Sequence, residues 1–442
     1  AQHLNAVIRH TIDKLDNETR LLEAADKEMT YYMDTHGVQD EGYDMIAARQ
    51  HTILLKTELN KRLLTALQAV DGQADIHIKR FTQKVPEHEV AFSPVFVETA
   101  GGRWAGGRWT KMRGQSHGLT RSLNGHIICG IWNGDTLTAG RRTDADGVYH
   151  GELNSMGTAV GHGSYEDSDG TYYEGQWKAD QRNGFGFSVD RHKLKAGEWK
   201  DNRYRGEKLH YTSERIYGID ISKYQHGKGK KFYPIAWDKL RISHLGHISK
   251  KTVAGDVDYP VSFVYIKSTE GTSVRNPYYA ADYRQAHKHG IRTGAYHFFS
   301  IRSNPAAQAY FFLKHSSFRK GDMPPVLDVE PTDEQITKLG GTGVLFSHIR
   351  TWMNIVKRRT GARPVLYVSQ RFVNKYLNRA PDIKQNYSVW IARYGEYKPD
   401  VRLVYWQLCP DGRVNGIHGE VDINVFNGYK DKFNEFLESE TI

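Results

Sequence analysis

Hydrophobic positions in the first part of the chain follow the repeat of an α-helix. Apolar residues recur at three- and four-residue spacing through residues 4–15 and again through residues 55–67. The intervening stretch HGVQDEG, residues 36–42, breaks this pattern with two glycines. We therefore predict an antiparallel helical hairpin over residues 1–71, followed by a polar connector over residues 72–100. Each apolar stripe needs a partner, which is either the other helix or, through self-association, a second chain.

A different pattern occupies residues 101–210, where a glycine followed two positions later by Trp or another large residue recurs every 21 to 24 residues. Its glycines are Gly107, Gly130, Gly151, Gly175 and Gly197. Repeats of this length are typical of arrays of stacked units, and close glycine pairs between alternating large and small residues are typical of β-hairpins. The segments resemble MORN repeats, with the motif Tyr-x-Gly-x-Trp and then Gly-x-Gly. That resemblance implies an array of β-hairpins that acts as a spacer or binds a partner.

Residues 211–442 alternate short β-branched or aromatic runs with helical stretches. This alternation is typical of a mostly parallel sheet that helices cover on its outside, and eight strands predict an irregular, TIM-barrel-like β/α barrel. The expected strands are residues 217–224, 263–271, 292–300, 324–330, 363–369, 387–394, 403–409 and 421–428, and the expected helices lie at about 276–289, 304–317, 342–360 and 430–439.

Composition narrows the class of protein. Apolar residues make up 39% and charged residues 25% of the 442 residues, as in ordinary globular proteins, and no apolar run is long enough to span a membrane. The net charge of +10 is concentrated in residues 216–442, which would favour a polyanionic partner such as a bacterial wall. No sequence-specific nucleic-acid motif is present, so nucleic acid is not an expected partner.

Carboxylates gather where the predicted barrel strands end. In PPVLDVE, residues 324–330, side-chain alternation places Asp328 and Glu330 on one face. Two carboxylates roughly 6–7 Å apart repel when both are charged, so one pKa should rise and leave a proton to donate. Glu330, last on the strand and longer, is the better candidate acid. Asp220 and Asp422 belong to two further strands whose polar residues we expect at the same end of the barrel.

One acid beside one anion is the arrangement that cleavage of a glycosidic bond needs. Aromatic or basic side chains on the same strands and their ends would form a sugar-binding groove around it. The expected groove residues are Tyr224, Tyr265, Lys267, Tyr296, Trp390 and Trp406.

The motifs of this region resemble those of the muramidases of glycoside hydrolase family 25, the Chalaropsis-type lysozymes. They run in the family's order: GIDISKYQ (218–225), FVYIKSTEGTS (263–273), GAYHFF (294–299), PPVLDVE (324–330), VLYVS (365–369), WIARY (390–394), YWQ (405–407) and VDINVF (421–426). The resemblance implies cleavage of the β-1,4 bond between N-acetylmuramic acid and N-acetylglucosamine in peptidoglycan. It also implies that Glu330 is the general acid and that Asp328 either stabilises positive charge or orients the substrate's N-acetyl group. Asp220 and Asp422 would complete the acidic site.

Other readings of the same residues stay open. A wall-binding scaffold without activity would have no need of a protonatable Glu330. An amidase or endopeptidase would need a metal or an activated cysteine, but no HExxH motif occurs, and we expect neither metal nor cofactor. The segment between Trp237 and Phe263 is longer than the family pattern, and we expect it beside the groove. A protein that acts on peptidoglycan is expected outside the cell or in the envelope, with a leader removed before Ala1.

Overall fold

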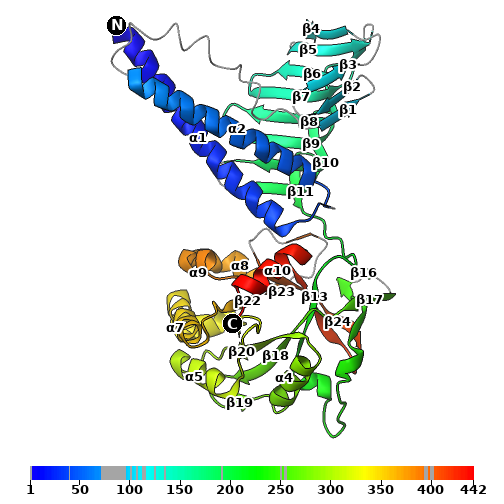
Figure 1. The fold of residues 1–442 in the computed structure, drawn as a ribbon, viewed down its shortest axis with the longest axis vertical. Coiled ribbons are helices and arrows are strands. Elements are labelled where there is room, and N and C mark those ends of the chain that lie inside the picture. Colours follow the sequence, from blue (N-terminus) through cyan, green and yellow to red (C-terminus); the bar gives the residue numbers. More distant parts are fainter. Residues whose placement is uncertain are drawn as a thin grey trace. The chain divides into compact units, whose positions relative to one another are not determined.

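The protein folds as two compact units, residues 1–208 and 209–442, in a computed structural model (Figure 1). The structure describes residues 2–38, 40–70, 96–99, 102–105, 108–111, 116–123, 126–133, 136–190, 193–248, 251–252, 256–392, 397–398 and 403–442. Most of the predicted connector, including residues 72–95, lies outside these ranges, as does Gly107. None of the helices in the described part of the chain has the length and apolar character needed to cross a membrane.

The first unit begins with the predicted helical hairpin, α1 (Gln2–Thr35) and α2 (Tyr43–Val70). Near their free ends the two helices pack on one another through apolar side chains, including Ile8 and Leu64. Nearer the turn, Leu22, Met29 and Ile53 share a buried cluster with the strand residues Tyr172 and Phe187. The helices therefore cover one face of the neighbouring sheet (Figure 1), and this sheet is a further partner for their apolar stripes.

The sheet of the first unit is an antiparallel meander of nine strands in sequence order, from β4 to β12. Its strands are β4 (Ser116–Leu123), β5 (His126–Asn133), β6 (Thr136–Thr143), β7 (Gly147–Leu153), β8 (Ala159–Asp167), β9 (Tyr172–Lys178), β10 (Gln181–Val189), β11 (Leu194–Lys200) and β12 (Arg203–Gly206). A separate small sheet holds β1 (Phe96–Thr99), β2 (Gly102–Ala105) and β3 (Arg108–Lys111). The sequence repeat thus corresponds to consecutive β-hairpins.

A row of glycines crosses this sheet because the repeat keeps glycine opposite glycine on adjacent strands. Gly163 pairs with Gly151 and Gly175, and Gly186 pairs with Gly175 and Gly197. A tyrosine covers the row at two of these positions. A Cβ atom on Gly163 or Gly186 would lie 2.3 Å from the hydroxyl of Tyr149 or Tyr173, respectively. Only glycine leaves room for these rings.

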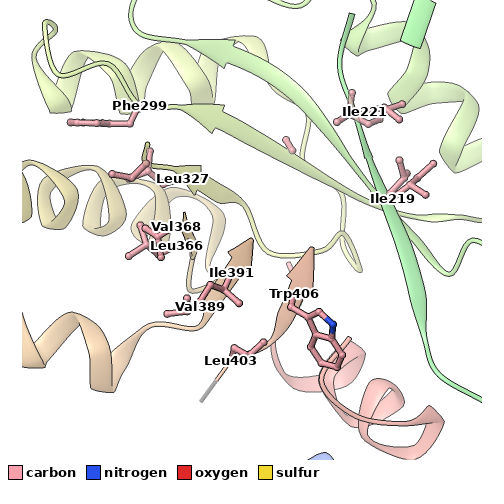
Figure 2. Close-up of a cluster of buried hydrophobic side chains, with 14 of the residues drawn as sticks. Ile219, Ile221, Phe299, Leu327, Leu366, Val368, Val389, Ile391, Leu403 and Trp406 are labelled. Carbon is pink, nitrogen blue, oxygen red and sulfur yellow. The ribbon is translucent and has the colours of Figure 1, made fainter. Parts of the chain in front are cut away.

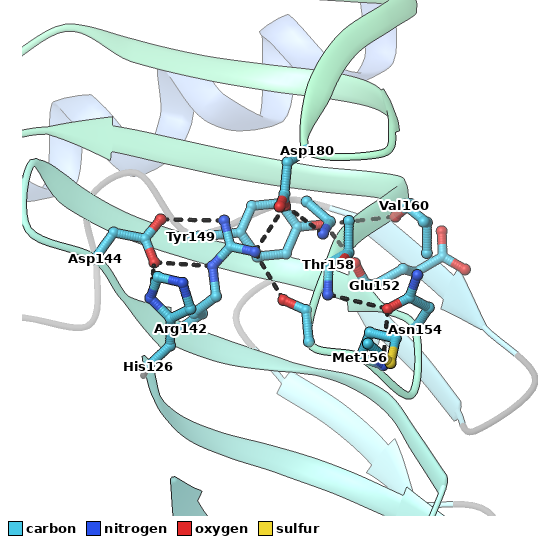
Figure 3. Close-up of polar contacts among 12 residues, drawn as sticks. His126, Arg142, Asp144, Tyr149, Glu152, Asn154, Met156, Thr158, Val160 and Asp180 are labelled. Carbon is cyan, nitrogen blue, oxygen red and sulfur yellow. Dashed lines mark hydrogen bonds and ion pairs between the residues drawn. The ribbon is translucent and has the colours of Figure 1, made fainter. Parts of the chain in front are cut away.

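Polar groups between neighbouring hairpins are paired (Figure 3). The buried Arg142 guanidinium donates from Nε and Nη2 to the two carboxylate oxygens of Asp144, at 2.9 and 3.1 Å. Its Nη1 donates to Asp180 Oδ1 and to the Gly157 carbonyl, both at 2.7 Å. The same guanidinium lies 5.3 Å from the centre of the Tyr149 ring. Arg142 on β6 thereby ties its strand to the turns that follow β7 and β9, in addition to the backbone pairing of the sheet.

The second unit contains a closed barrel of eight strands in the order β13, β18, β20, β21, β22, β23, β24, β25. Seven are parallel, whereas β25 runs antiparallel to both β24 and β13 and closes the barrel. All eight predicted strands are present: β13 (Tyr217–Ile221), β18 (Phe263–Glu270), β20 (Arg292–Phe298), β21 (Val326–Asp328), β22 (Val365–Ser369), β23 (Val389–Ala392), β24 (Tyr405–Asn415) and β25 (Val421–Phe426).

The four predicted barrel helices are also present, as α4 (Tyr279–Lys288), α5 (Pro305–His315), α7 (Thr342–Thr360) and α10 (Lys430–Ser439). The sequence analysis missed three short ones, α6 (Asp333–Leu339), α8 (Gln370–Lys375) and α9 (Pro381–Asn386). Alternate side chains such as Ile219, Leu327, Leu366 and Ile391 point outward into the buried layer around the barrel (Figure 2).

Inside the barrel, a second apolar cluster fills the end at which the parallel strands begin. Phe263 and Tyr405, each the first residue of its strand, pack there against Phe433 and Phe436 of α10. Aromatic side chains and a helix therefore block this end of the barrel. Only the opposite end, where the parallel strands finish, is left for a site.

The long segment after Trp237 forms strands on the extended end of β24. Its β14 (Arg241–His244) pairs with β24 and with β17 (Asp256–Pro260), and β15 (His247–Ile248) pairs with β16 (Lys251–Thr252). Ile242 and Leu245 join the buried layer around the barrel. None of its described residues lines the pocket at the barrel mouth, so a place for this segment beside a wider groove stays a prediction.

Candidate active site

A pocket of about 190 Å³ opens at the end of the barrel where the parallel strands finish. Six of the residues proposed from the sequence line it: Asp220, Asp328, Glu330, Asp422, Tyr296 and Trp390. Val326, Tyr367 and Gln407 complete the lining. Most of these side chains come from inward positions near strand ends, so period-two alternation brings them together.

The reversed direction of β25 explains how Asp422, near the start of its strand, joins residues at the ends of other strands. Asp220 on β13 and Asp422 on β25 are register partners in the antiparallel pair. Such partners have Cβ atoms roughly 4.5–5.5 Å apart, and like charges directly opposite one another repel. Burial raises the pKa of Asp220, and burial together with Asp220 raises the pKa of Asp422 to about 10.

Neutral amides hold Asp220 in place. Its Oδ2 accepts hydrogen bonds from Asn424 Nδ2 at 2.8 Å and from Gln407 Nε2 at 3.1 Å. Trp390 Nε1 in turn donates to Asn424 Oδ1 at 2.9 Å, and the Tyr367 hydroxyl donates to Gln407 Oε1 at 3.0 Å. This network fixes the position of the carboxyl group without placing a cation beside it.

Asp328 and Glu330 lie on the same inward face, as the alternation predicts, but they differ in exposure. Asp328 is buried, with 9% of its surface exposed, whereas Glu330 is exposed. Burial, the negative charge of Glu330 and a hydrogen bond with Glu330 raise the pKa of Asp328 well above its usual range. Asp328 Oδ1 has no hydrogen-bond partner among the described residues. The exposed carboxyl can therefore reach a ligand, while the buried one lies beneath it with an unused acceptor.

Tyr296 shares this acidic environment. Burial, followed by the charges of Asp220 and Asp328, raises the pKa of its hydroxyl well above the usual value. The Tyr296 hydroxyl is therefore a neutral donor in the pocket at physiological pH. It is the kind of group that can donate to an oxygen of a ligand or to a carboxylate.

Four other residues proposed from the sequence lie elsewhere. Tyr265 is fully buried and donates to the Pro324 carbonyl at 3.0 Å. Trp406 is also fully buried, on the outer face of β24, where its Nε1 donates to the Tyr211 hydroxyl at 3.2 Å. Lys267 pairs with Glu270 at 2.7 Å, and Tyr224 is 58% exposed. None of the four lines the pocket, and burial makes Tyr265 and Trp406 inaccessible to a sugar.

Three polar residues of the site were missed: Tyr367, Gln407 and Asn424. All three lie within motifs already noted, VLYVS, YWQ and VDINVF. Alternation gives the missing signal, because Asn424 lies two positions from Asp422 on the same face. On β24 the same rule places Gln407 inward and its neighbour Trp406 outward.

The chemistry of the pocket is that of carboxyl groups, amides and hydroxyls. No cluster of three or more His, Cys, Asp or Glu suited to a metal ion occurs among the described residues. Cys409, the thiol considered for a cysteine hydrolase, is buried on β24, and burial raises its pKa to about 12. It is therefore a poor nucleophile at neutral pH.

Comparison with known proteins places this arrangement in a family. Residues 219–417 match the model of the glycosyl hydrolases family 25. The chain is 31% identical over 230 residues to YegX of Escherichia coli O6:H1, covering 51% of this chain and 75% of that protein. It is 33% identical over 228 residues to lysozyme M1 of Streptomyces globisporus, covering 48% of this chain and 68% of that protein. The crystal structure of a bacterial lysozyme from Streptomyces coelicolor aligns with a TM-score of 0.41 at 27% identity, over 51% of this chain and 97% of that one. On the family model and the two sequence relatives, the chain belongs to glycosyl hydrolase family 25 and is a glycoside hydrolase.

Proposed function

We propose that this enzyme hydrolyses the β-1,4 bond between N-acetylmuramic acid and N-acetylglucosamine in peptidoglycan. The observation that carries the proposal is the pair of carboxyls at the end of β21, buried Asp328 as its last residue and exposed Glu330 two residues beyond, at the open end of the barrel. Membership of the family, which includes lysozyme M1 and an N,O-diacetylmuramidase of Chalaropsis, supports the choice of substrate.

Glu330 acts as the general acid in this proposal. Asp220, Asp328 and Asp422 retain protons that isolated carboxyls would lose, because burial and mutual repulsion disfavour their charged forms. Of Asp328 and Glu330, Glu330 is the exposed member, so it can reach a glycosidic oxygen. Protonation of that oxygen lets the bond to the sugar C1 atom break as positive charge develops on the ring.

Asp328 orients the substrate's N-acetyl group. Its unpaired Oδ1 is an acceptor for the N–H of a 2-acetamido group, whose carbonyl oxygen then attacks C1 from the opposite face. The hydrogen bond between Asp328 and Glu330 leaves no space between them for the attacking water that an inverting pair requires. Water then adds at C1 and returns a proton to Glu330, so the configuration of the sugar is retained.

Three further groups support this step by hydrogen bonding: Asp220, Asp422 and Tyr296. The raised pKa values of Asp220 and Asp422 favour the protonated forms, so the oxygens of this pair bind polar groups of the substrate, and the neutral Tyr296 hydroxyl donates to the substrate or to Asp328. Trp390 lines the pocket but only 2% of its surface is exposed, so its proposed part is to hold Asn424 in place through Nε1 rather than to stack on a sugar. Lys267 and Tyr224 remain proposals for contacts with a longer glycan, outside the pocket itself.

The proposed substrate places the enzyme outside the cell or in the envelope. Within the first unit, the hairpin meander supports assignment to MORN-type repeats acting as a spacer or partner-binding module. Self-association through α1 and α2 stays a proposal, and the apolar area that α1 and α2 bury on the sheet counts against it.

Digestion of purified peptidoglycan followed by mass spectrometry of the products tests the function. Muramic acid at the new reducing ends is the expected result, and glucosamine there would contradict the proposed bond. The non-catalytic alternative, a wall-binding scaffold, predicts that the wild-type protein pellets with walls and releases no fragments.

A further inference from the structure

A second, larger pocket of about 360 Å³ lies on the flank of the barrel unit, between α7 and α9. It differs from the acidic site in the charge of its lining. Its walls include the cations Arg350, Lys357 and Arg363 and a single carboxylate, Asp382, together with Asn354, Asn386 and Tyr387.

Topology separates this pocket from the catalytic mouth. Arg363 lies just before β22 and Tyr387 lies just before β23, so both are at the ends where the parallel strands begin. Lys357 is in the last turn of α7, the helix that leads into β22. Asp328, in contrast, ends β21 at the opposite end of the barrel. The flank pocket therefore cannot be a subsite of the groove beside Glu330.

The positive charges in the pocket are only partly neutralised. Arg350 and Asp382 form a two-pronged pair, Nε to Oδ2 at 2.7 Å and Nη2 to Oδ1 at 2.8 Å, and these bonds hold the pKa of Asp382 below its usual value. Lys357 and Arg363 form no ion pair with any described residue. The Tyr387 hydroxyl donates to Asn354 Oδ1 at 3.2 Å, which orients the amide of Asn354 at the wall.

We propose that this flank pocket binds an anionic group, a carboxylate or a phosphate, of an envelope polymer while the barrel mouth is free for the glycan. Two unpaired cations beside amide and hydroxyl donors are the groups that bind such oxygens. A cation in the last turn of α7 also complements the helix dipole, which would account for Lys357 alone. The helix dipole does not account for Arg363, which lies beyond the end of α7, or for the concave wall between Lys357 and Arg363.

The test uses the full-length protein and two soluble polyanions without glycosidic bonds, poly(L-glutamate) and poly(glycerol phosphate). Binding is measured by isothermal titration calorimetry at low ionic strength. The pocket variant is Lys357→Gln with Arg363→Gln. The control variant is Lys320→Gln with Arg358→Gln, which removes the same charge from exposed positions outside the pocket, one of them in the same turn of α7.

We expect the pocket variant to bind at least one polyanion about tenfold more weakly than the wild type, because charge-assisted hydrogen bonds are roughly twice as strong as neutral ones. The control variant should stay within about twofold, because its two charges do not line the pocket and cannot donate to an anion held there. Loss with poly(L-glutamate) alone would identify carboxylates as the ligand, and loss with poly(glycerol phosphate) alone would identify phosphodiesters.

Equal weakening in both variants would overturn the proposal in favour of a diffuse basic surface, and so would failure of both polyanions to bind. Hydrolysis of short soluble glycans should be unchanged in the pocket variant, because neither residue belongs to the catalytic pocket. The calorimetric result does not depend on that activity. The flank-pocket proposal can therefore be wrong while the proposed function is right, and the proposed function can be wrong while the flank pocket binds polyanions.

Discussion

Both units bury carboxylates in a β-sheet, but they treat the charge differently. In the hairpin sheet, Glu174 is fully buried, and its Oε2 accepts from Arg49 Nη2 at 3.0 Å and from the Tyr172 hydroxyl at 2.8 Å. In the barrel, Asp328 is buried beside Glu330 and forms no ion pair within the described residues. A compensated buried carboxylate keeps its charge and stabilises the fold, whereas a buried carboxyl without a cation retains its proton, which is the state that acid chemistry uses.

Of the variants that test this difference between the two units, Glu330→Gln should have the largest effect on activity. The amide keeps the shape of the side chain but has no acidic proton, so peptidoglycan hydrolysis should fall by about 10²–10⁴-fold. Release of soluble fragments from purified walls measures the loss. The melting temperature should be unchanged, because Glu330 is exposed.

Glu334→Gln is the matched control, an exposed glutamate on α6 whose partner is Lys338. This control should keep full activity. If Glu330→Gln turned over walls at a near-normal rate, the proposed acid would be wrong.

Arg49→Met tests the compensated charge. Removal of the guanidinium leaves the buried charge of Glu174 without its arginine partner, with the Tyr172 hydroxyl and His162 still in contact, which should destabilise the first unit by about 3–5 kcal/mol. Hydrogen exchange of the α2 and β9 amides in the full chain measures the effect, while hydrolysis of soluble glycans should be unaltered.

Arg62→Met removes a cation from an exposed pair with Glu58 in the same helix, and it should change stability by less than about 1 kcal/mol. Similar exchange rates in both variants would mean that the buried pair contributes no more than a surface pair.

Gly186→Ala tests the packing that the repeat imposes. The added methyl group meets the Tyr173 hydroxyl and cannot be accommodated without moving a largely buried ring, so we expect a loss of about 1–3 kcal/mol. Thermal unfolding followed by tyrosine and tryptophan fluorescence measures it. Gly343→Ala in α7, where a Cβ atom meets nothing within 4 Å, should be neutral or stabilising.

A smaller effect concerns pH. The folded-state pKa of Asp422 lies near 10, above the ordinary carboxyl value of about 3.9, so the folded protein retains a proton that the unfolded chain releases. The stability due to this proton is fully present below about pH 4 and is lost as the pH rises toward the folded pKa. Asp422→Asn mimics the protonated form and does not lose this stability. The melting temperature of the variant minus that of the wild type should therefore increase from pH 4 to pH 9.

Asp258→Asn is the opposite control, because a hydrogen bond from Arg241 lowers the pKa of that exposed carboxyl. It should show no gain at higher pH. A melting-temperature difference that is flat with pH in Asp422→Asn would mean that Asp422 is charged in the folded protein.

The barrel strands could be predicted because each is a short apolar run bounded by turns. The position of the carboxylates in the pocket could be predicted because side-chain alternation along a strand assigns each of them to its inward face. Two of the expected groove residues lie outside the pocket, each for a different physical reason. Trp406 was chosen for its aromatic ring, but the alternation that sends Gln407 inward sends Trp406 outward, against Tyr211. Tyr265 points inward but lies too deep, next to the Tyr405 hydroxyl at 2.7 Å.

The sequence does not indicate in which direction a single strand runs or which strands pair along its full length. Nothing in VDINVF indicates that β25 runs antiparallel, and nothing in the segment after Trp237 indicates that β14 would pair with the end of β24. Both features depend on partners far away in the chain. Local patterns describe a strand but not its neighbour.

The closure of the barrel by β25 has a consequence for biosynthesis. The first barrel strand, β13, takes the last, β25, as its partner, so this pairing cannot form until residues 421–426 have left the ribosome. Contacts between such distant segments form late, because the intervening loop must first be closed. Asp220 meets Asp422 only through that pairing. We therefore expect a nascent chain that ends before residue 421 to carry Glu330 without the assembled pocket and to be inactive.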